Sequence, residues 1–156
     1  MREDQFAELQ DYIREAFPVD LPPEVLIQHS CNECYSLQKA FIGKRWTEVP
    51  GITIVENYDK LPLFTPEAFA FYVPAFMTFV LREATQDDSV LEFLIYSLSP
   101  SGDNSESFLN LRKEKLNSAQ RKAICNFLHF VRIKDDSFES DIAGAMKFFD
   151  CANLSD

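Results

Sequence analysis

The chain has 156 residues, enough for one domain that buries a sizeable hydrophobic core without covalent cross-links. A hydrophobic content of 46% excludes a disordered chain, and a formal net charge of −10 argues against direct binding to nucleic acid or to an anionic membrane surface. The sequence has no run of about 18 apolar residues, so no transmembrane helix is predicted. The acidic start Met1–Gln5 does not resemble a signal peptide. We therefore expect a soluble, cytoplasmic protein.

The first part of the chain predicts two helical regions. Apolar residues at spacings of three and four predict an amphipathic helix over 3–17, which Pro18 ends. Residues 23–42 predict one or two further helices, and the pair Cys31 and Cys34 marks the place where a break would fall.

Residues 43–64 are the least regular part of the sequence, because prolines and glycines interrupt them repeatedly. The β-branched run 52–55 favours a strand. Since no partner strand is evident, we interpret this run as an extended loop.

The clearest helix signal is Thr65-Pro66-Glu67, which places a capping residue, a proline and an acid in the order that helix starts prefer. The helix is predicted to run to Ala84. Its residues are apolar on all sides, as in a buried central helix. Pro74 lies in its interior, where it should kink the helix and leave one carbonyl without a partner.

Further helices are predicted after the central one. Asp87 or Asp88 is expected to cap a helix over 89–98, and the turn residues of 100–105 predict a surface loop.

Two helices are predicted nearer the C-terminus. Asn117 followed by Gln120 resembles a capping box, in which two side chains bond the free N–H groups of a helix start. The last helix is predicted over 138–152.

These elements predict an all-α fold, a single domain over 1–156 with about six helices around the central apolar helix at 65–84. The irregular segment 43–64 is expected to pack across one side. Residues 135–156 are predicted as an acidic C-terminal helix and tail.

Charge is unevenly distributed along the chain. Residues 1–35, 82–110 and 135–156 carry net charges of −6, −5 and −5, whereas residues 111–134 carry +6. The simplest interpretation of the basic segment is that it neutralises acidic neighbours inside the fold. The acidic excess either serves only solubility or attracts a basic partner.

The cysteines and histidines are candidate metal ligands. His29, Cys31 and Cys34 resemble half of a zinc site. Cys125 and His129, four residues apart on a predicted helix, face the same way and would complete it. The gap of about ninety residues between the halves is long for a compact zinc module, so ordinary reduced thiols are the alternative.

A Cys-x-x-Cys pair also occurs in thioredoxin-like redox sites, where it follows a strand. No strand is predicted before Cys31, and Glu33 lies between the two thiols. The sequence therefore disfavours a redox site.

Signatures of catalysis are missing from the sequence. It has no glycine-rich phosphate loop, no Gly-x-Ser-x-Gly and no His-Glu-x-x-His. We therefore do not expect an enzyme, and zinc is the one cofactor that we consider. Trp46 is either a hot spot for a partner or a plug that packs the irregular segment onto the core.

Five short patterns follow one another over about residues 24–132. They are His29-x-Cys31-x-Glu33-Cys34, Phe41-x-Gly43-x-Arg45-Trp46, Leu61-Pro62-Leu63-x-Thr65-Pro66-Glu67-Ala68-Phe69, Tyr72-x-Pro74-Ala75-Phe76 and Val90-Leu91-Glu92-Phe93-Leu94. The series resembles an uncharacterised bacterial domain family of unknown function. The resemblance implies a bacterial cytoplasmic protein and brings no activity, cofactor or site residue with it. The acidic end at 135–156 lies outside the pattern.

These observations predict a small binding and neutralising protein, such as the immunity partner of a bacterial toxin or another inhibitor. Its partner would be basic, for example a nuclease toxin whose groove is blocked by carboxylates that mimic phosphates. The residues expected to bind it, with Trp46, are Asp135, Asp136, Glu139, Asp141, Asp87, Asp88 and Glu92. The alternative is a zinc protein, structural or catalytic, built on His29, Cys31 and Cys34.

Overall fold

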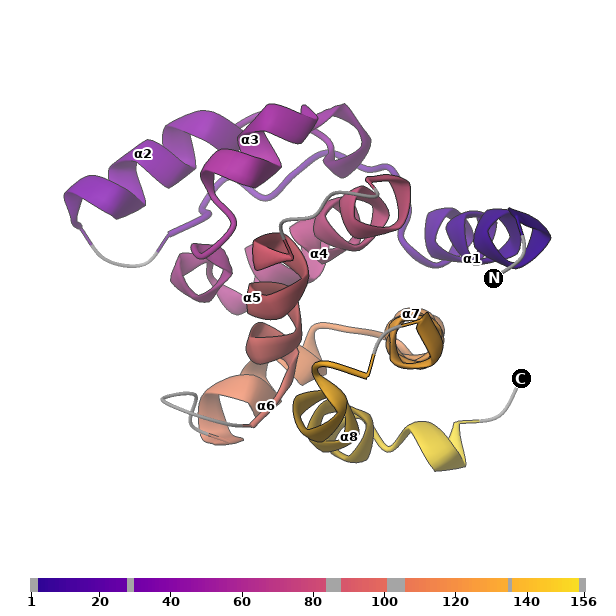
Figure 1. The fold of residues 1–156 in the computed structure, drawn as a ribbon. Coiled ribbons are helices and arrows are strands. Elements are labelled where there is room, and N and C mark those ends of the chain that lie inside the picture. Colours follow the sequence, from indigo (N-terminus) through magenta and orange to yellow (C-terminus); the bar gives the residue numbers. More distant parts are fainter. Residues whose placement is uncertain (1–2, 28–29, 84–87, 101–105, 135, 155–156) are drawn as a thin grey trace.

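The computed structural model of the chain describes residues 3–27, 30–83, 88–100, 106–134 and 136–154. Over these ranges the chain forms eight α-helices and no β-strand, so the predicted all-α single domain is confirmed. The elements are α1 (Glu3–Ala16), α2 (Asn32–Phe41), η1 (Trp46–Glu48), α3 (Gly51–Glu56), η2 (Leu61–Leu63), α4 (Pro66–Arg82), α5 (Ser89–Leu98), α6 (Glu106–Glu114), α7 (Ser118–Lys134), α8 (Glu139–Phe148) and η3 (Cys151–Asn153), where η marks a short 3₁₀ segment. In Figure 1, α2 and α3 lie on one side of α4 and α5, and α6, α7 and α8 lie on the other.

Helix α4 forms the centre of the core, as predicted. Ten of its seventeen residues are buried, and it packs against α1, α3, α5 and α6. Thr65 caps its start, because the Thr65 hydroxyl oxygen accepts a hydrogen bond of 3.0 Å from the Ala68 N–H. The helix continues through the buried Pro74, which has no N–H to donate to the Ala70 carbonyl.

Helix α1 packs against α4 and α7. Leu9 and Ile13 are buried on its inner face. Beyond the helix end, the indole N–H of Trp46 donates a hydrogen bond of 3.0 Å to the Phe17 carbonyl. Trp46 is only 5% exposed. It therefore plugs the irregular segment onto the core, which is the alternative that the sequence analysis gave to a partner-binding role.

Of the one or two helices predicted over 23–42, α2 is confirmed, whereas the described chain just before it is extended, which corrects the first part of that prediction. Ile27 forms an isolated antiparallel bridge with Phe64, and the Thr65 N–H donates a hydrogen bond of 2.8 Å to the Leu26 carbonyl. These bonds come from residues far along the chain, so local periodicity could not reveal them.

Helix α3 corrects the interpretation of 52–55 as an extended loop. Ile54 is buried in the core, and α3 packs on α4. The approach is close at Gly51, where a Cβ atom would lie 3.4 Å from the ring of Phe79. The β-branched residues are helical here because burial against α4 outweighs their intrinsic preference for strands.

Helix α6 is missing from the prediction, and its inward positions explain why. Leu109 and Arg112 in α6, and Leu116 just after its end, follow one another at spacings of three and four, and each is 1% exposed. A charged residue at the middle position hides the apolar period on which helix prediction depends.

The two helices nearest the C-terminus differ in how well they were predicted. The capping box of α7 is confirmed. The Gln120 N–H donates a hydrogen bond of 2.8 Å to the side-chain oxygen of Asn117, and the Asn117 N–H donates one of 2.9 Å to the side-chain oxygen of Gln120. The helix predicted over 138–152 is shorter than expected, since α8 ends at Phe148. Asp150 then adopts a left-handed conformation with a φ of 56°.

Candidate functional site

Basic side chains of the segment 111–134 bind carbonyls at the C-terminal ends of helices. Arg112 donates a hydrogen bond of 3.0 Å to the Ser97 carbonyl in α5, and Lys113 donates one of 2.8 Å to the Phe148 carbonyl in α8. Such carbonyls have no partner within their own helix, and the negative helix end favours a cation. Within the described residues, these two cations are therefore held by backbone carbonyls, and not by the acidic neighbours that the sequence suggested.

The acids predicted near the C-terminus have different surroundings. Arg132 pairs with Glu139 at 2.6 Å, between α7 and α8, which is the neutralisation that the sequence suggested for the basic segment. Asp136 is exposed and Asp141 is half-buried, while Asp135 lies outside the described residues. Asp136 is thus the clearest candidate for a partner contact among them.

Two more of the predicted acids lie at the start of α5. Asp88 and Glu92 are one helical turn apart, and both are exposed. Asp88 occupies the N-cap position, but its side chain makes no capping bond. Asp87 falls outside the described residues. The start of α5 therefore carries a second small acidic surface.

Helix α1 carries an acidic surface that the sequence analysis did not single out. Its members are Asp4, Glu8, Asp11 and Glu15, all exposed. Spacings of four, three and four place them within about 60° of the helix circumference, opposite the buried face. We call these four residues the acidic face of α1. The spacing was visible in the sequence, and reading it as a stripe would have found this surface.

A hollow of about 290 Å³ lies between α1 and α7, at one edge of the acidic face. Its lining includes Glu8, Tyr12, His129 and Phe130. A carboxylate beside aromatic walls suits the aliphatic stem and the cationic end of a lysine or arginine. The lining of the hollow therefore has the chemistry to accept a basic side chain.

A second cleft, of about 300 Å³, lies between α1, η1 and α4. Its charged lining consists of Asp11, Glu83, Arg14 and Arg82. Because both signs are equally represented, this cleft favours neither an anion nor a cation.

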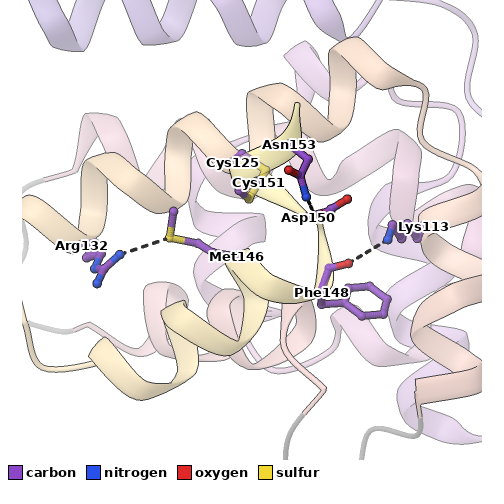
Figure 2. The surroundings of a disulfide bond; sticks show 8 residues. All are labelled: Lys113, Cys125, Arg132, Met146, Phe148, Asp150, Cys151 and Asn153. Atoms are coloured by element: carbon purple, nitrogen blue, oxygen red, sulfur yellow. Dashed lines mark hydrogen bonds between the residues drawn. A yellow bond between two sulfur atoms is a disulfide. The ribbon is translucent and has the colours of Figure 1, made fainter. Parts of the chain in front are cut away.

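All four cysteines form disulfides, Cys31 with Cys34 and Cys125 with Cys151, which corrects the expectation of reduced thiols. Figure 2 shows Cys151 beside Cys125 of α7, with Lys113 directed at the Phe148 carbonyl nearby. The second disulfide thus ties the chain after α8 to α7.

The structure does not assemble the predicted joint metal site. Cys31, Cys34 and Cys125 are in disulfides and are not available as thiolates. His129 is exposed and lines the hollow that faces α1, and His29 lies outside the described residues. Where the structure describes the chain, no three His, Cys, Asp or Glu residues are grouped to hold a metal ion.

The fold and surface define a small all-α domain with an excess of exposed carboxylates. The chain belongs to a family of unknown function, DUF6714, whose sequence model matches residues 6–147. The resemblance to an uncharacterised family is therefore confirmed. The match extends beyond 24–132 at both ends, so the family includes most of α8, which was expected to lie outside it.

Comparison with curated proteins and with solved structures finds no match for the chain. None of the helices in the described ranges has the length and apolar character needed to cross a membrane.

Proposed function

We propose that the protein is a non-enzymatic binding protein that neutralises a basic protein partner in the cytoplasm, as an immunity protein or inhibitor does. The observation that carries the proposal is the acidic face of α1, four exposed carboxylates on one side of one helix. The partner class that fits best is a nuclease toxin, because its phosphate-binding groove attracts carboxylates.

The placement of the cations supports this proposal. Arg112 and Lys113 bind helix carbonyls, and Arg121 donates a hydrogen bond of 3.1 Å to the carbonyl of Lys113. Of these cations Arg112 is buried, so its charge is not presented beside the exposed carboxylates. The net charge of −10 favours fast encounter with a basic protein.

The hollow beside the acidic face gives the proposal a specific contact. A lysine or arginine of the partner would place its charge at Glu8 and its stem between Tyr12 and Phe130. The exposed Asp136, Asp88 and Glu92 are further proposed contacts. Asp135 and Asp87 are also proposed, although both lie outside the described residues. Glu139 and Asp141 contribute less, since the first already binds Arg132 and the second is half-buried.

The experiment is a pull-down from the host at low salt, followed by elution in a salt gradient and mass spectrometry. We expect a stoichiometric basic protein that salt releases. Its affinity for the purified chain should fall steeply with ionic strength, because exposed charges are screened over about 8 Å at physiological salt.

Two variants of equal charge test the site. One changes the acidic face by Asp4→Asn, Glu8→Gln, Asp11→Asn and Glu15→Gln. The control changes four other exposed acids by Asp20→Asn, Glu24→Gln, Glu56→Gln and Glu114→Gln. The first should weaken binding about tenfold to a hundredfold and the control much less. Equal losses in both variants, or an affinity that salt leaves unchanged, would overturn the proposal.

A further inference from the structure

The start of α2 places two cysteines in unequal surroundings. Cys31 is the N-cap residue of the ten-residue helix and is exposed, whereas Cys34 is only 1% exposed. The sulfur of Cys31 accepts a hydrogen bond of 3.0 Å from the Cys34 N–H, and the two sulfurs form a disulfide. One sulfur is therefore open to attack, and the other is protected.

The second disulfide has the opposite character. Cys125 is 6% exposed, and Cys151 lies 26 residues further along the chain. A cross-link between distant residues restricts the unfolded chain strongly, whereas one across three residues restricts it little. Cys125–Cys151 thus has a structural purpose that Cys31–Cys34 lacks.

An open hollow of about 580 Å³ leads to the first disulfide. Both cysteines line it, with Ile27, Tyr35 and Gln38 among the other lining residues. Tyr35 is 74% exposed and offers an apolar surface beside the reactive sulfur. This hollow is wide enough to admit a thiol carried by another molecule.

We propose that Cys31 and Cys34 are a redox-active dithiol–disulfide couple that exchanges with cysteinyl thiols, carried either by a polypeptide or by glutathione. In the oxidised protein, the donor thiolate attacks the sulfur of Cys31. In the reduced protein, Cys31 attacks the substrate disulfide, and Cys34 then resolves the mixed disulfide by attacking Cys31. The activity is separate from the binding of a basic partner, and neither proposal depends on the other.

The reaction balances as two exchanges. A thiolate of the donor, either a polypeptide with two thiols or the first of two glutathione molecules, attacks Cys31, the Cys31–Cys34 bond breaks, and Cys34 leaves as a thiolate and takes up a proton. The second donor thiolate then attacks its partner sulfur in the mixed disulfide, and Cys31 leaves and is protonated in turn. Two electrons and two protons pass from the donor, which becomes a disulfide, and reduced Cys31 reverses these steps on a substrate disulfide.

The helix start favours Cys31 as the leaving and attacking sulfur. A thiolate there accepts the Cys34 N–H and lies at the positive end of the α2 dipole, both of which stabilise its charge. The exposed carboxylate of Glu33 in the first turn acts against this. In the Cys34→Ser variant, the pH dependence of alkylation should give Cys31 a pKa below about 8.5, and adding Glu33→Gln should lower it further.

The first test reduces the full-length wild-type protein under native conditions with rising concentrations of dithiothreitol. Maleimide labelling and peptide mass spectrometry then report each cysteine separately. We expect Cys31 and Cys34 to become labelled at concentrations that leave Cys125 and Cys151 paired. Loss of both disulfides together, only when the protein unfolds, would overturn the proposal.

The second test traps the intermediate. The Cys34→Ser variant, offered glutathione disulfide or a disulfide-bonded polypeptide, should accumulate a mixed disulfide at Cys31, and the faster reagent identifies the substrate source. The Cys31→Ser variant should react at least tenfold more slowly, because Cys34 is buried. A Cys125→Ser/Cys151→Ser control should retain the wild-type exchange rate, and equal reaction rates for the Cys31→Ser and Cys34→Ser variants would refute the assignment.

Discussion

The Nη1 of Arg112 donates a hydrogen bond of 3.0 Å to the carbonyl oxygen of Ser97, in the last turn of α5. The same guanidinium lies 4.5 Å from the ring centre of Phe69 and 4.4 Å from that of Phe108. Burial lowers its pKa to about 10. Arg112 therefore caps one helix and fills the space between two rings, although the core disfavours its charge.

This relationship predicts that the volume of Arg112 matters more for stability than its charge. Arg112→Ala should lower the free energy of unfolding by about 2–4 kcal/mol, because it leaves a cavity beside both rings. Arg112→Met keeps most of the volume and removes a buried charge, so it should cost less than about 1.5 kcal/mol. Urea unfolding followed by circular dichroism measures both. The exposed Arg14→Met is the control, and equal losses for the Met and Ala variants would show that the charge dominates.

Tyr72 gives a prediction about alkaline pH. Its hydroxyl lies 2.8 Å from the Phe41 carbonyl oxygen and 2.6 Å from that of Lys44, shares its one proton between them, and so holds the end of α2 on α4. Burial, and secondly the charge of Glu48, raise the pKa of Tyr72 above its usual value of 10.0. Above that pH the unfolded chain loses this proton while the folded chain keeps it, so stability falls as pH rises.

The Tyr72→Phe variant separates these two effects. At pH 8 it should be less stable than wild type by about 1–3 kcal/mol, because the carbonyls of Phe41 and Lys44 lose the donor that they share. At pH 11 the advantage of the wild type should shrink by about 1.4 kcal/mol, since the unfolded tyrosine ionises there. Unfolding curves at the two pH values measure the difference. Tyr35→Phe, at an exposed position, should change stability little at pH 8.

The elements that the sequence predicted well are those with local signals. Thr65 and the pair Asn117 and Gln120 cap their helices through bonds that span three residues. Local signals of this kind are visible in a single sequence. The acidic face of α1 was not predicted, although its spacing alone places its carboxylates together and was equally visible in the sequence.

The elements that were missed depend on contacts across the fold. Helix α3 forms because Ile54 is buried in the core. The apolar pattern of α6 is interrupted by the inward-facing Arg112, whose partner carbonyl lies in α5. The pairing of Cys125 with Cys151 likewise follows from the packing of α7 and the turn at Asp150. None of these contacts leaves a short-range pattern in the sequence.

The capping box of α7 predicts a matched set of small losses. Asn117→Ala should lower the free energy of unfolding by about 1 kcal/mol, because the Gln120 N–H loses its acceptor. Gln120→Ala should cost less, since it removes the reciprocal bond at an exposed site. Thermal or urea unfolding measures both. Asn110→Ala, at an exposed position within α6, is the control and should leave stability unchanged or slightly increased.

The two disulfides should contribute unequally to stability. Removing Cys125–Cys151 by a double Ala substitution should cost about 3–4 kcal/mol, because the bond closes a long loop and fixes the chain after α8 on α7. Removing Cys31–Cys34 in the same way should cost about 2 kcal/mol or less, since its loop is short. Urea unfolding of the two variants, each with its remaining disulfide intact, measures the two losses of stability. A larger loss of stability on removing Cys31–Cys34 would mean that this bond stabilises the fold more than its short loop explains. It would then have a structural role, which argues against a role in thiol exchange.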